Sequence, residues 1–205
     1  MVIAASGLVL VVFLLVHLAG LGLALWDASA FERTASALHQ AAWLPAAELG
    51  LLVLLLVHPA QALARVVANR AARGAVAAQP RSRREGLAEP WVALAGRLMP
   101  WSGSLMLVFL VVHLAQLRLQ RPSAGQELAA LLAVLRQPHW LALYAAVGLA
   151  VAGHLAHGQE SAHRSLGLLD PGNARAIRLA GRSLALLIGA GFTLLPFALL
   201  QGGMR

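Results

Sequence analysis

The chain lacks two residue types altogether. Its 205 residues include no cysteine, which excludes disulfides, thiolate nucleophiles, cysteine-ligated metals and iron–sulfur clusters. Lysine is also absent, so all 16 Lys-plus-Arg positions are arginine. The formal net charge is nevertheless +8. We do not expect a nucleic-acid partner, because the arginines lie between apolar segments, where membrane topology accounts for them.

Long apolar runs dominate what is present. Hydrophobic residues make up 60% of the chain, more than a soluble domain of this size requires. Several segments approach the roughly 20 residues that a membrane-spanning helix needs. The first of them lacks a preceding basic stretch and is too long for a cleavable signal peptide, so we expect it to be retained. We predict an all-α integral membrane bundle, a single domain over 1–205, with transmembrane helices at about 3–26, 45–66, 100–119, 139–159 and 183–201.

The arginines predict the orientation of these helices. Eleven lie around the connections after the second and fourth helices, and five lie on the other side. Since arginine-rich connections remain in the cytoplasm, we expect a bacterial inner-membrane protein with its N-terminus in the cytoplasm and its C-terminus outside. The polar stretch 69–90 is predicted to be a mobile loop. The eleven arginines expected on the cytoplasmic side are Arg65, Arg70, Arg73, Arg81, Arg83, Arg84, Arg97, Arg164, Arg175, Arg178 and Arg182. The five expected on the other side are Arg33, Arg118, Arg121, Arg136 and Arg205.

An internal repeat relates the first two predicted helices to the next two. The segment SGLVLVVFLLVHLAG at 6–20 matches SGSLMLVFLVVHLAQ at 102–116, with an offset of 96 residues. The same offset relates His58 of the second helix to His154 of the fourth. We therefore predict two helical hairpins, about 6–66 and 102–162, followed by a fifth helix. The matched positions in the first helix of each hairpin include Ser6/Ser102, Gly7/Gly103, Phe13/Phe109 and His17/His113.

Each of the first four predicted helices contains a histidine whose depth predicts a partner. A single intramembrane histidine often only forms a hydrogen bond between helices, but ionisable residues in lipid are costly and usually functional. At about 1.5 Å per residue, His17 and His113 lie about 5 Å to the outer side of the bilayer centre. His58 and His154 lie about 4–8 Å to the inner side, so the two pairs are about 10 Å apart in depth.

Two imidazoles on facing helices suit axial ligation of a haem iron. We predict that the first four helices surround two haems b, the outer held by His17 and His113 and the inner by His58 and His154. Zinc or copper transport is a less favoured use of these histidines, because no carboxylate lies beside them in the membrane. Small residues near the ligands either admit a flat macrocycle or serve ordinary helix packing; they are Gly7, Gly20, Gly103 and Gly153.

At these residues the chain resembles the cytochrome b membrane anchor of succinate:quinone oxidoreductases and fumarate reductases, in its single-subunit, five-helix form with two haems b. The resemblance runs from about residue 6 to residue 200 and includes SG…FLLVHL, WSG…FLVVHL and GHLAHGQESAHRSLG. Its most specific part is a histidine followed by glycine four residues later and serine seven later, at His154, Gly158 and Ser161. The family has one haem ligand on each of helices 1 to 4, which correspond here to His17, His58, His113 and His154.

The resemblance implies an electron-transfer subunit of an oxidoreductase complex in the respiratory chain and the tricarboxylic acid cycle. A flavoprotein with FAD and an iron–sulfur subunit would bind on the cytoplasmic face. Electrons would pass between the iron–sulfur subunit and membrane quinone, either menaquinone or ubiquinone, through the two haems. The chain itself would carry out no succinate chemistry, and the complex could form a higher oligomer. The alternatives are a dihaem cytochrome b of another complex, such as a hydrogenase or formate dehydrogenase, and a haem-free anchor or metal transporter.

Three further residues are of interest at the inner side. His157 lies three residues after His154 and is the rival ligand, or a hydrogen-bond partner of a haem propionate or a quinone. Arg97 either pairs with a propionate of the inner haem or serves membrane topology alone. Pro59 follows His58 within the second helix, where a missing amide proton predicts a kink.

The outer side contains candidate quinone contacts. His39, beside Trp43, either lines an outer quinone site or is a solvated loop histidine. Asp27 or Glu32 is predicted to carry protons to or from that quinone. No Asp or Glu precedes His157 in the fourth helix, so a transmembrane proton path through a carboxylate of that helix is not expected.

Overall fold

A computed structural model of the chain describes residues 1–73 and 89–202, which contain helices and no strand. Five helices are long and apolar enough to cross a membrane, which confirms the all-α membrane fold predicted from the sequence. Two shorter helices and one π-helical turn complete the described chain. In order, the elements are α1 (Val2–Trp26), α2 (Ala28–Gln40), α3 (Leu44–Arg73), α4 (Glu89–His113), η1 (Leu114–Arg118), α5 (Glu127–Leu135), α6 (Pro138–Ser165) and α7 (Ala174–Gly202).

Several long helices extend beyond the apolar segments that predicted them. α4 begins at Glu89 and α7 at Ala174, whereas their apolar runs begin near 100 and 183. α3 continues past Pro59 to Arg73, so the stretch predicted as a loop is helical at both of its ends. Its remainder, 74–88, lies outside the described residues. Helix ends can extend past the hydrocarbon layer because their arginines and other polar residues reach the interface.

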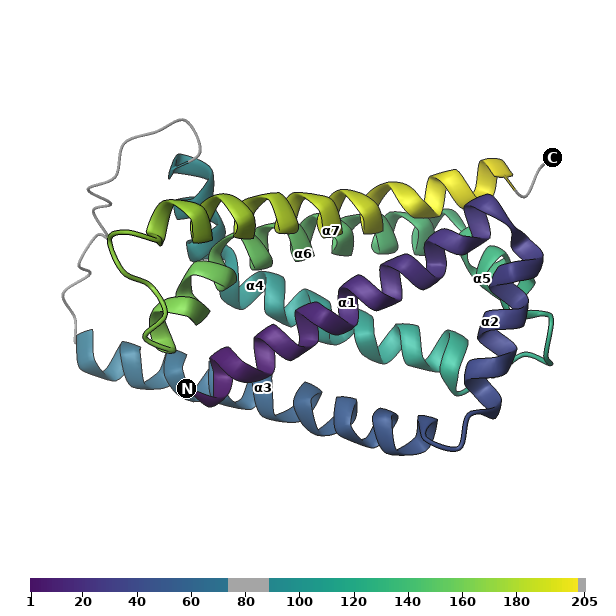
Figure 1. Cartoon of the computed structure of the whole chain (residues 1–205), viewed down its shortest axis with the longest axis horizontal. Helices are drawn as coiled ribbons and strands as arrows, with labels where there is room; N and C mark the ends of the chain where they lie inside the picture. The colour runs from purple at the N-terminus through teal and green to yellow at the C-terminus, as the bar shows by residue number, and fades with distance from the viewer. Residues whose placement is uncertain (74–88, 203–205) are drawn as a thin grey trace.

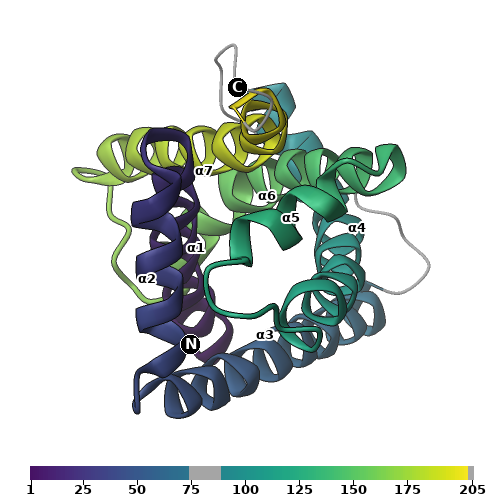
Figure 2. The same ribbon diagram turned by 90° about the vertical axis from the view of Figure 1, so that its right-hand side faces the viewer.

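The long helices lie along a common axis, and α2 and α5 lie together at one end (Figure 1). Viewed along that axis, α1, α3, α4 and α6 surround a central space, and α7 lies outside against α6 (Figure 2). The N-terminus and the turn between α6 and α7 lie at the other end. We call these the α2–α5 end and the N-terminal end. Ser6, near the start of α1, lies beside His58 in the middle of α3.

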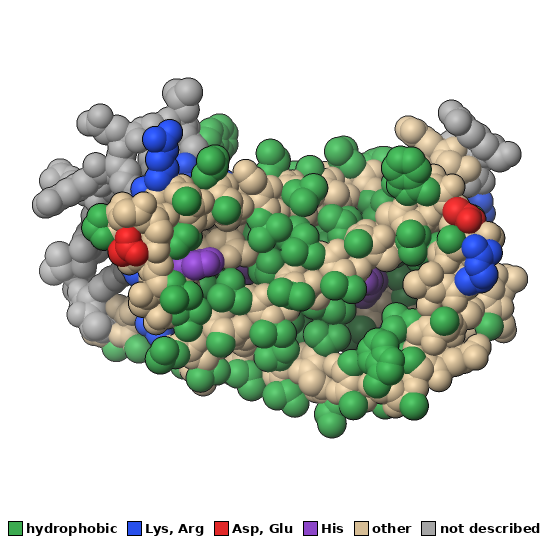
Figure 3. Space-filling view, in the orientation of Figure 1, with side chains coloured by type: hydrophobic (Ala, Val, Ile, Leu, Met, Phe, Trp, Pro, Cys, Tyr) green, Lys and Arg blue, Asp and Glu red, His purple; other side chains and the backbone are tan. Residues whose placement is uncertain are grey.

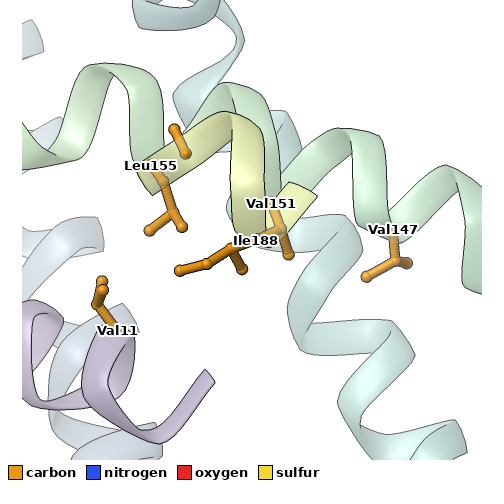
Figure 4. Packing of buried hydrophobic residues seen from close by; sticks show 6 residues of the cluster. Val11, Val147, Val151, Leu155 and Ile188 are labelled. Atoms are coloured by element: carbon orange, nitrogen blue, oxygen red, sulfur yellow. The ribbon is translucent and has the colours of Figure 1, made fainter. Parts of the chain in front are cut away.

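Buried apolar packing is concentrated where α1, α6 and α7 meet. One cluster joins Val11 of α1 to residues of α6 and to Ile188 of α7, which is fully buried (Figure 4). A second cluster joins α5 to the last turns of α7. By contrast, the apolar windows of α3 and α4 contain no buried residue. These two helices therefore face the central space on one side and the surroundings of the bundle on the other.

Two glycines allow α6 and α7 to approach closely. A Cβ atom at Gly148 would lie 2.6 Å from the backbone nitrogen of Thr193. A Cβ atom at Gly189 would clash with Ala152. Close backbone approach through small residues is a common way for helices to associate in lipid, where no hydrophobic force drives them together. α6 and α7 therefore pack tightly against each other on one side of the central space.

Asp27 forms the corner between α1 and α2. Its backbone is extended (φ −152°, ψ 101°), and its carboxylate accepts the amide protons of Ser29 and Ala30 at the start of α2. Such a cap satisfies amides that the beginning of a helix leaves unpaired. The segment predicted as an outer loop is therefore a helix, and the prediction of His39 as a loop histidine is wrong, because His39 lies in the last turn of α2.

Candidate functional site

The central space is a cavity of about 2380 Å³. A site for one drug-sized ligand occupies about 300–1,000 Å³, so this cavity has room for more than one large ligand. Its lining is mostly leucine, valine, alanine and glycine. Histidine side chains are visible at two places along the long axis of the molecule, among the apolar side chains (Figure 3). The four histidines predicted as haem ligands all line the cavity: His17, His58, His113 and His154.

The structure brings these histidines together in the two predicted pairs. The ring centres of His17 and His113 are 6.0 Å apart, with their planes at 84°. Those of His58 and His154 are 6.4 Å apart, with their planes at 60°. An imidazole nitrogen binds a metal at about 2 Å and lies about 1.1 Å from its ring centre, so two axial imidazoles have centres about 6.2 Å apart. Both separations therefore fit one iron atom between the rings.

The donor set also suits haem better than a free ion. Each pair offers two imidazoles and no carboxylate, which is the axial set of a bis-histidine haem. A closed metal site usually needs four protein ligands, as in structural zinc sites. Among residues 1–73 and 89–202 no group of three or more His, Asp or Glu side chains could hold a metal ion. Ligation itself stays a prediction.

Two serine hydroxyls determine which nitrogen of His58 and His154 is available. Oγ of Ser6 lies 3.1 Å from Nδ1 of His58, and Oγ of Ser102 lies 3.2 Å from Nδ1 of His154. Each hydroxyl donates its proton to the backbone carbonyl three residues earlier, at 3.2 and 3.1 Å. With that proton engaged, the oxygen can accept a proton from Nδ1, which favours the tautomer with an unprotonated Nε2. That nitrogen is the one available to bind a metal.

The glycines of the repeat explain how these two rings fit. A Cβ at Gly7 would lie 3.0 Å from Cε1 of His58, and a Cβ at Gly103 would lie 3.6 Å from Cε1 of His154. The Ser–Gly pair at the start of each repeat thus receives the histidine of the second helix in the same hairpin. Nothing lies within 4 Å of a Cβ at the other two small residues predicted to matter, Gly20 and Gly153.

The phenylalanines of the repeat stack on the other two histidines. Phe13 stacks on His17 and Phe109 on His113, each one helical turn apart with ring centres 5.4 Å apart. Phe192 of α7 also stacks on His17, at 6.0 Å. The serines, glycines, phenylalanines and histidines that the repeat preserves therefore either are histidines of the site or contact one.

Tyr144 is a partner of His113 that the repeat does not predict. Its hydroxyl lies 3.1 Å from Nδ1 of His113 and donates to Oε1 of Gln116 at 3.2 Å. The phenolic oxygen therefore accepts the Nδ1 proton of His113, which leaves Nε2 of this histidine available as well. Gln116 lies in η1, the π-helical turn that follows His113 directly. Such turns are frequent at functional sites.

His157 and Arg97 line the cavity from α6 and α4. A Cβ at Gly96 would lie 2.8 Å from Cε1 of His157, so this ring packs on the backbone of α4. The ring of His154, in contrast, faces His58. The side chain of Arg97 is exposed. Both residues are in the part of the cavity near the N-terminal end, and contact with a haem propionate stays a prediction.

Two carboxylates and an imidazole meet at the α2–α5 end. Glu127 is 8% exposed, lies 3.3 Å from Nδ1 of His39 and accepts the amide proton of Gly125 at 2.8 Å. Glu32 accepts the amide protons of Glu127 and Leu128, at 3.1 and 2.9 Å. A residue of α2 therefore caps α5. His39 and Glu127 line the central cavity, whereas Glu32 lines a separate hollow of about 460 Å³.

The pKa values of these two carboxyl groups shift in opposite directions. Burial raises the pKa of Glu32, and its hydrogen bond with Glu127 raises it further. Burial also acts to raise the pKa of Glu127, but hydrogen bonds from Glu32 and from backbone amides, with attraction to His39, lower it overall. Of the two carboxyl groups, Glu127 therefore loses its proton first and Glu32 second as pH rises.

Two of the predicted quinone residues lie away from the cavity wall. The carboxylate of Asp27 is 3.7 Å from the guanidinium of Arg33, and its hydrogen bonds with Ser29 and the Ala30 amide lower its pKa. Trp43 is 60% exposed. Of the four predicted quinone residues, His39 alone is among the residues that line the cavity.

Fold and site together define a multi-pass helical membrane protein with five candidate membrane spans and a cavity that contains two pairs of facing histidines. Comparisons with protein-family models, with curated proteins and with solved structures found no match. The length and hydropathy of the helices indicate that they cross a membrane. The chemistry of the cavity residues is the basis for inferring a function.

Several residues of the site escaped prediction. Ser6 and Ser102 carried a usable signal, since the repeat preserves them, but their partners on another helix could not be predicted from spacing. Tyr144, Gln116 and Glu127 carried no such signal. Each acquires its role from a neighbour on a different element, and neither the repeat nor hydropathy distinguishes them.

Proposed function

We propose that the chain is the dihaem cytochrome b membrane anchor of a succinate dehydrogenase or fumarate reductase complex. The observation that carries this proposal is the arrangement of four cavity histidines in two pairs, each spaced for one iron atom. His17 and His113 would hold the outer haem b, and His58 and His154 the inner one. When bound, a bis-histidine haem accepts and releases single electrons.

The chain's own residues would orient the haem ligands and limit the access of water to the cavity. Ser6, Ser102 and Tyr144 would accept Nδ1 protons and so leave Nε2 of three histidines available to iron. The leucine-rich lining would limit the access of water to the haems, which would keep the local dielectric low. Arg97 and His157 would meet the acidic groups of the inner haem.

The arginines support the proposed orientation and partners. The described arginines around the ends of α3, α4, α6 and α7 gather at the N-terminal end, which the positive-inside rule assigns to the cytoplasm of a bacterial inner membrane. An iron–sulfur subunit and a flavoprotein with FAD would bind there. That end is also the one closer to His58 and His154. The described arginines concerned are Arg65, Arg97, Arg164, Arg175, Arg178 and Arg182.

Membrane quinone would bind at the other end. His39 is on the wall of the cavity beside Glu127, at the end nearer to His17 and His113. Menaquinone and ubiquinone both have carbonyl oxygens that an imidazole can hydrogen-bond. Glu32 would exchange protons with this site through Glu127, whereas Trp43 and Asp27 are not among the residues that line the cavity.

The haem content of the purified protein tests this function. Protein extracted from membranes in mild detergent should contain two haems b per chain by its reduced-minus-oxidised spectrum. Replacing any one of the four ligands with alanine should remove the haem of its pair. His157→Ala should retain both haems, as should His139→Ala, a control whose histidine is exposed next to Trp140. A wild-type protein without haem would overturn the proposal.

The partners need a separate test. Affinity purification of the chain from its native membranes should also isolate two soluble subunits, one of which carries covalent flavin that fluoresces in a denaturing gel. Two haems without a flavin-bearing subunit would favour the alternative, a dihaem cytochrome b that serves a different respiratory complex.

A further inference from the structure

The two histidine pairs differ in how their imidazoles are held. At the His58–His154 pair, both rings have a serine hydroxyl on Nδ1. At the other pair His113 has Tyr144, while His17 is in contact with aromatic rings and has no hydrogen bond within the described parts of the chain. At the His17–His113 pair, the hydroxyl group of Tyr144 therefore orients one of the two imidazoles.

The repeat does not supply that hydroxyl group. The residue 96 positions before Tyr144 is Glu48, and its carboxylate is engaged by the guanidinium of Arg118, with two donor–acceptor distances of 2.7 Å. Glu48 is therefore unavailable to His17. The asymmetry between the pairs is thus built into the second hairpin, where Tyr144 of α6 reaches His113 of α4.

The hydrogen bond from Tyr144 to Gln116 favours one direction for the hydrogen bonds in this group. The phenol donates to Oε1 of Gln116, so its oxygen accepts from Nδ1 of His113. An acceptor at Nδ1 raises the basicity of the ligating nitrogen and so stabilises the more positive state of a bound metal. The donation to Gln116 polarises the phenol and strengthens its oxygen as an acceptor. The phenol ring is held edge-on against Phe109, with centres 4.8 Å apart.

We infer that Tyr144, supported by Gln116, is a positioning residue that fixes the ring of His113 and lowers the reduction potential of the haem at the His17–His113 pair relative to the same site without it. This inference rests on the proposed function. It concerns the electron-donating strength of one ligand and adds no step to electron transfer. According to this inference, different residues set the reduction potentials of the two haems. Tyr144 and Gln116 act on one haem, and two serines act on the other.

Redox titration of the purified dihaem protein tests the inference. Tyr144→Phe retains the ring and its contact with Phe109 but removes the acceptor, so one midpoint potential should move upward while the other stays unchanged. Ser102→Ala is the matched control and should move the other potential. Electron paramagnetic resonance of the oxidised protein provides a second readout, because a free His113 ring changes the angle between the two imidazole planes, now 84°.

A second variant protects the test against loss of haem or of folding. Gln116→Glu preserves every aromatic contact and makes the phenol a stronger acceptor, so the potential that Tyr144→Phe raises should move downward. Two bound haems with unchanged potentials in both variants would overturn the inference and leave the proposed function intact. The same is true if Tyr144→Phe and Ser102→Ala shift the same potential. A wild-type protein without haem would instead defeat both.

Discussion

The hydroxyl oxygen of Ser6 lies 3.1 Å from Nδ1 of His58, across the interface between α1 and α3. The second hairpin repeats this contact between Ser102 and His154 at 3.2 Å. In each hairpin, therefore, the first helix orients the histidine of the second. Outer-shell hydrogen bonds of this kind fix the tautomer and direction of a metal ligand. The repeat thus preserves a contact between helices, in addition to the identities of single residues.

Loss of either serine hydroxyl should weaken haem binding at one centre. Ser6→Ala and Ser102→Ala each leave an imidazole proton without an acceptor, and such changes typically cost about 10–100-fold in metal affinity. Haem titration of the apoprotein would measure the loss. Ser183→Ala, at an exposed position of α7 outside the cavity lining, is the control and should bind haem like the wild type. Equal affinity in all three variants would show that the serines do not support ligation.

The two repeat glycines should differ in their tolerance of alanine. A Cβ at Gly7 would be only 3.0 Å from His58, so Gly7→Ala should displace this ring and reduce the haem content of the His58–His154 pair. A Cβ at Gly103 would be at an ordinary contact distance of 3.6 Å from His154, and Gly103→Ala should retain both haems. Haem per chain is the measurement, with Gly22→Ala as the control in open space. The reverse order would contradict the placement of the rings.

Close packing of α6 on α7 should make Gly148 intolerant of any side chain. A Cβ there would lie 2.6 Å from the backbone nitrogen of Thr193, and overpacking of this kind typically costs about 1–3 kcal/mol. Gly148→Ala should therefore lower the thermal midpoint in detergent. Gly153→Ala on the same helix meets nothing within 4 Å and should be neutral or stabilising, since alanine favours helix by about 1 kcal/mol. Equal midpoints would refute close contact between the two helices.

The contact between α2 and α5 should depend on pH in both directions. The raised pKa of Glu32 adds stability that is present at low pH and is lost as pH rises from the ordinary glutamate pKa through the raised one. The lowered pKa of Glu127 adds stability that is present above the ordinary pKa and is lost as pH falls through the lowered one. The contact should therefore be strongest near the ordinary glutamate pKa.

Hydrogen exchange of the amides of Glu127 and Leu128 would measure this dependence, because Glu32 accepts both protons. After correction for intrinsic exchange, their protection should fall as pH rises in the wild type. Glu32→Gln cannot ionise, so its protection should stay level over the same range. Parallel profiles for the two proteins would contradict a raised pKa of Glu32.

Hydropathy and the repeat were sufficient to predict the five long helices and the facing of His17 with His113 and of His58 with His154. Both depend on local properties. A long apolar segment is unfavourable in water and favours the membrane, and the position of a histidine in that segment determines its depth. Helix ends were predicted less well. α4 and α7 begin in segments with polar residues, where hydropathy is weak although the helical backbone continues.

The α2–α5 end could not be predicted from the same signals. α2 is short and mixed in composition, and it becomes a helix through the Asp27 cap and its contacts with α1, α3 and α5. Glu32 and Glu127 are 95 residues apart in sequence. Their meeting depends on how two peripheral helices pack on the bundle, which no spacing in the chain predicts.

The pairing of ligands is tested most directly by counting haems in two double variants of the purified protein. Removal of both members of one pair, by His17→Ala with His113→Ala, should leave one haem per chain. Removal of one member from each pair, by His17→Ala with His58→Ala, should leave none, although the same number of histidines is lost. Equal haem content in the two double variants, or a wild-type protein without two haems, would contradict the account.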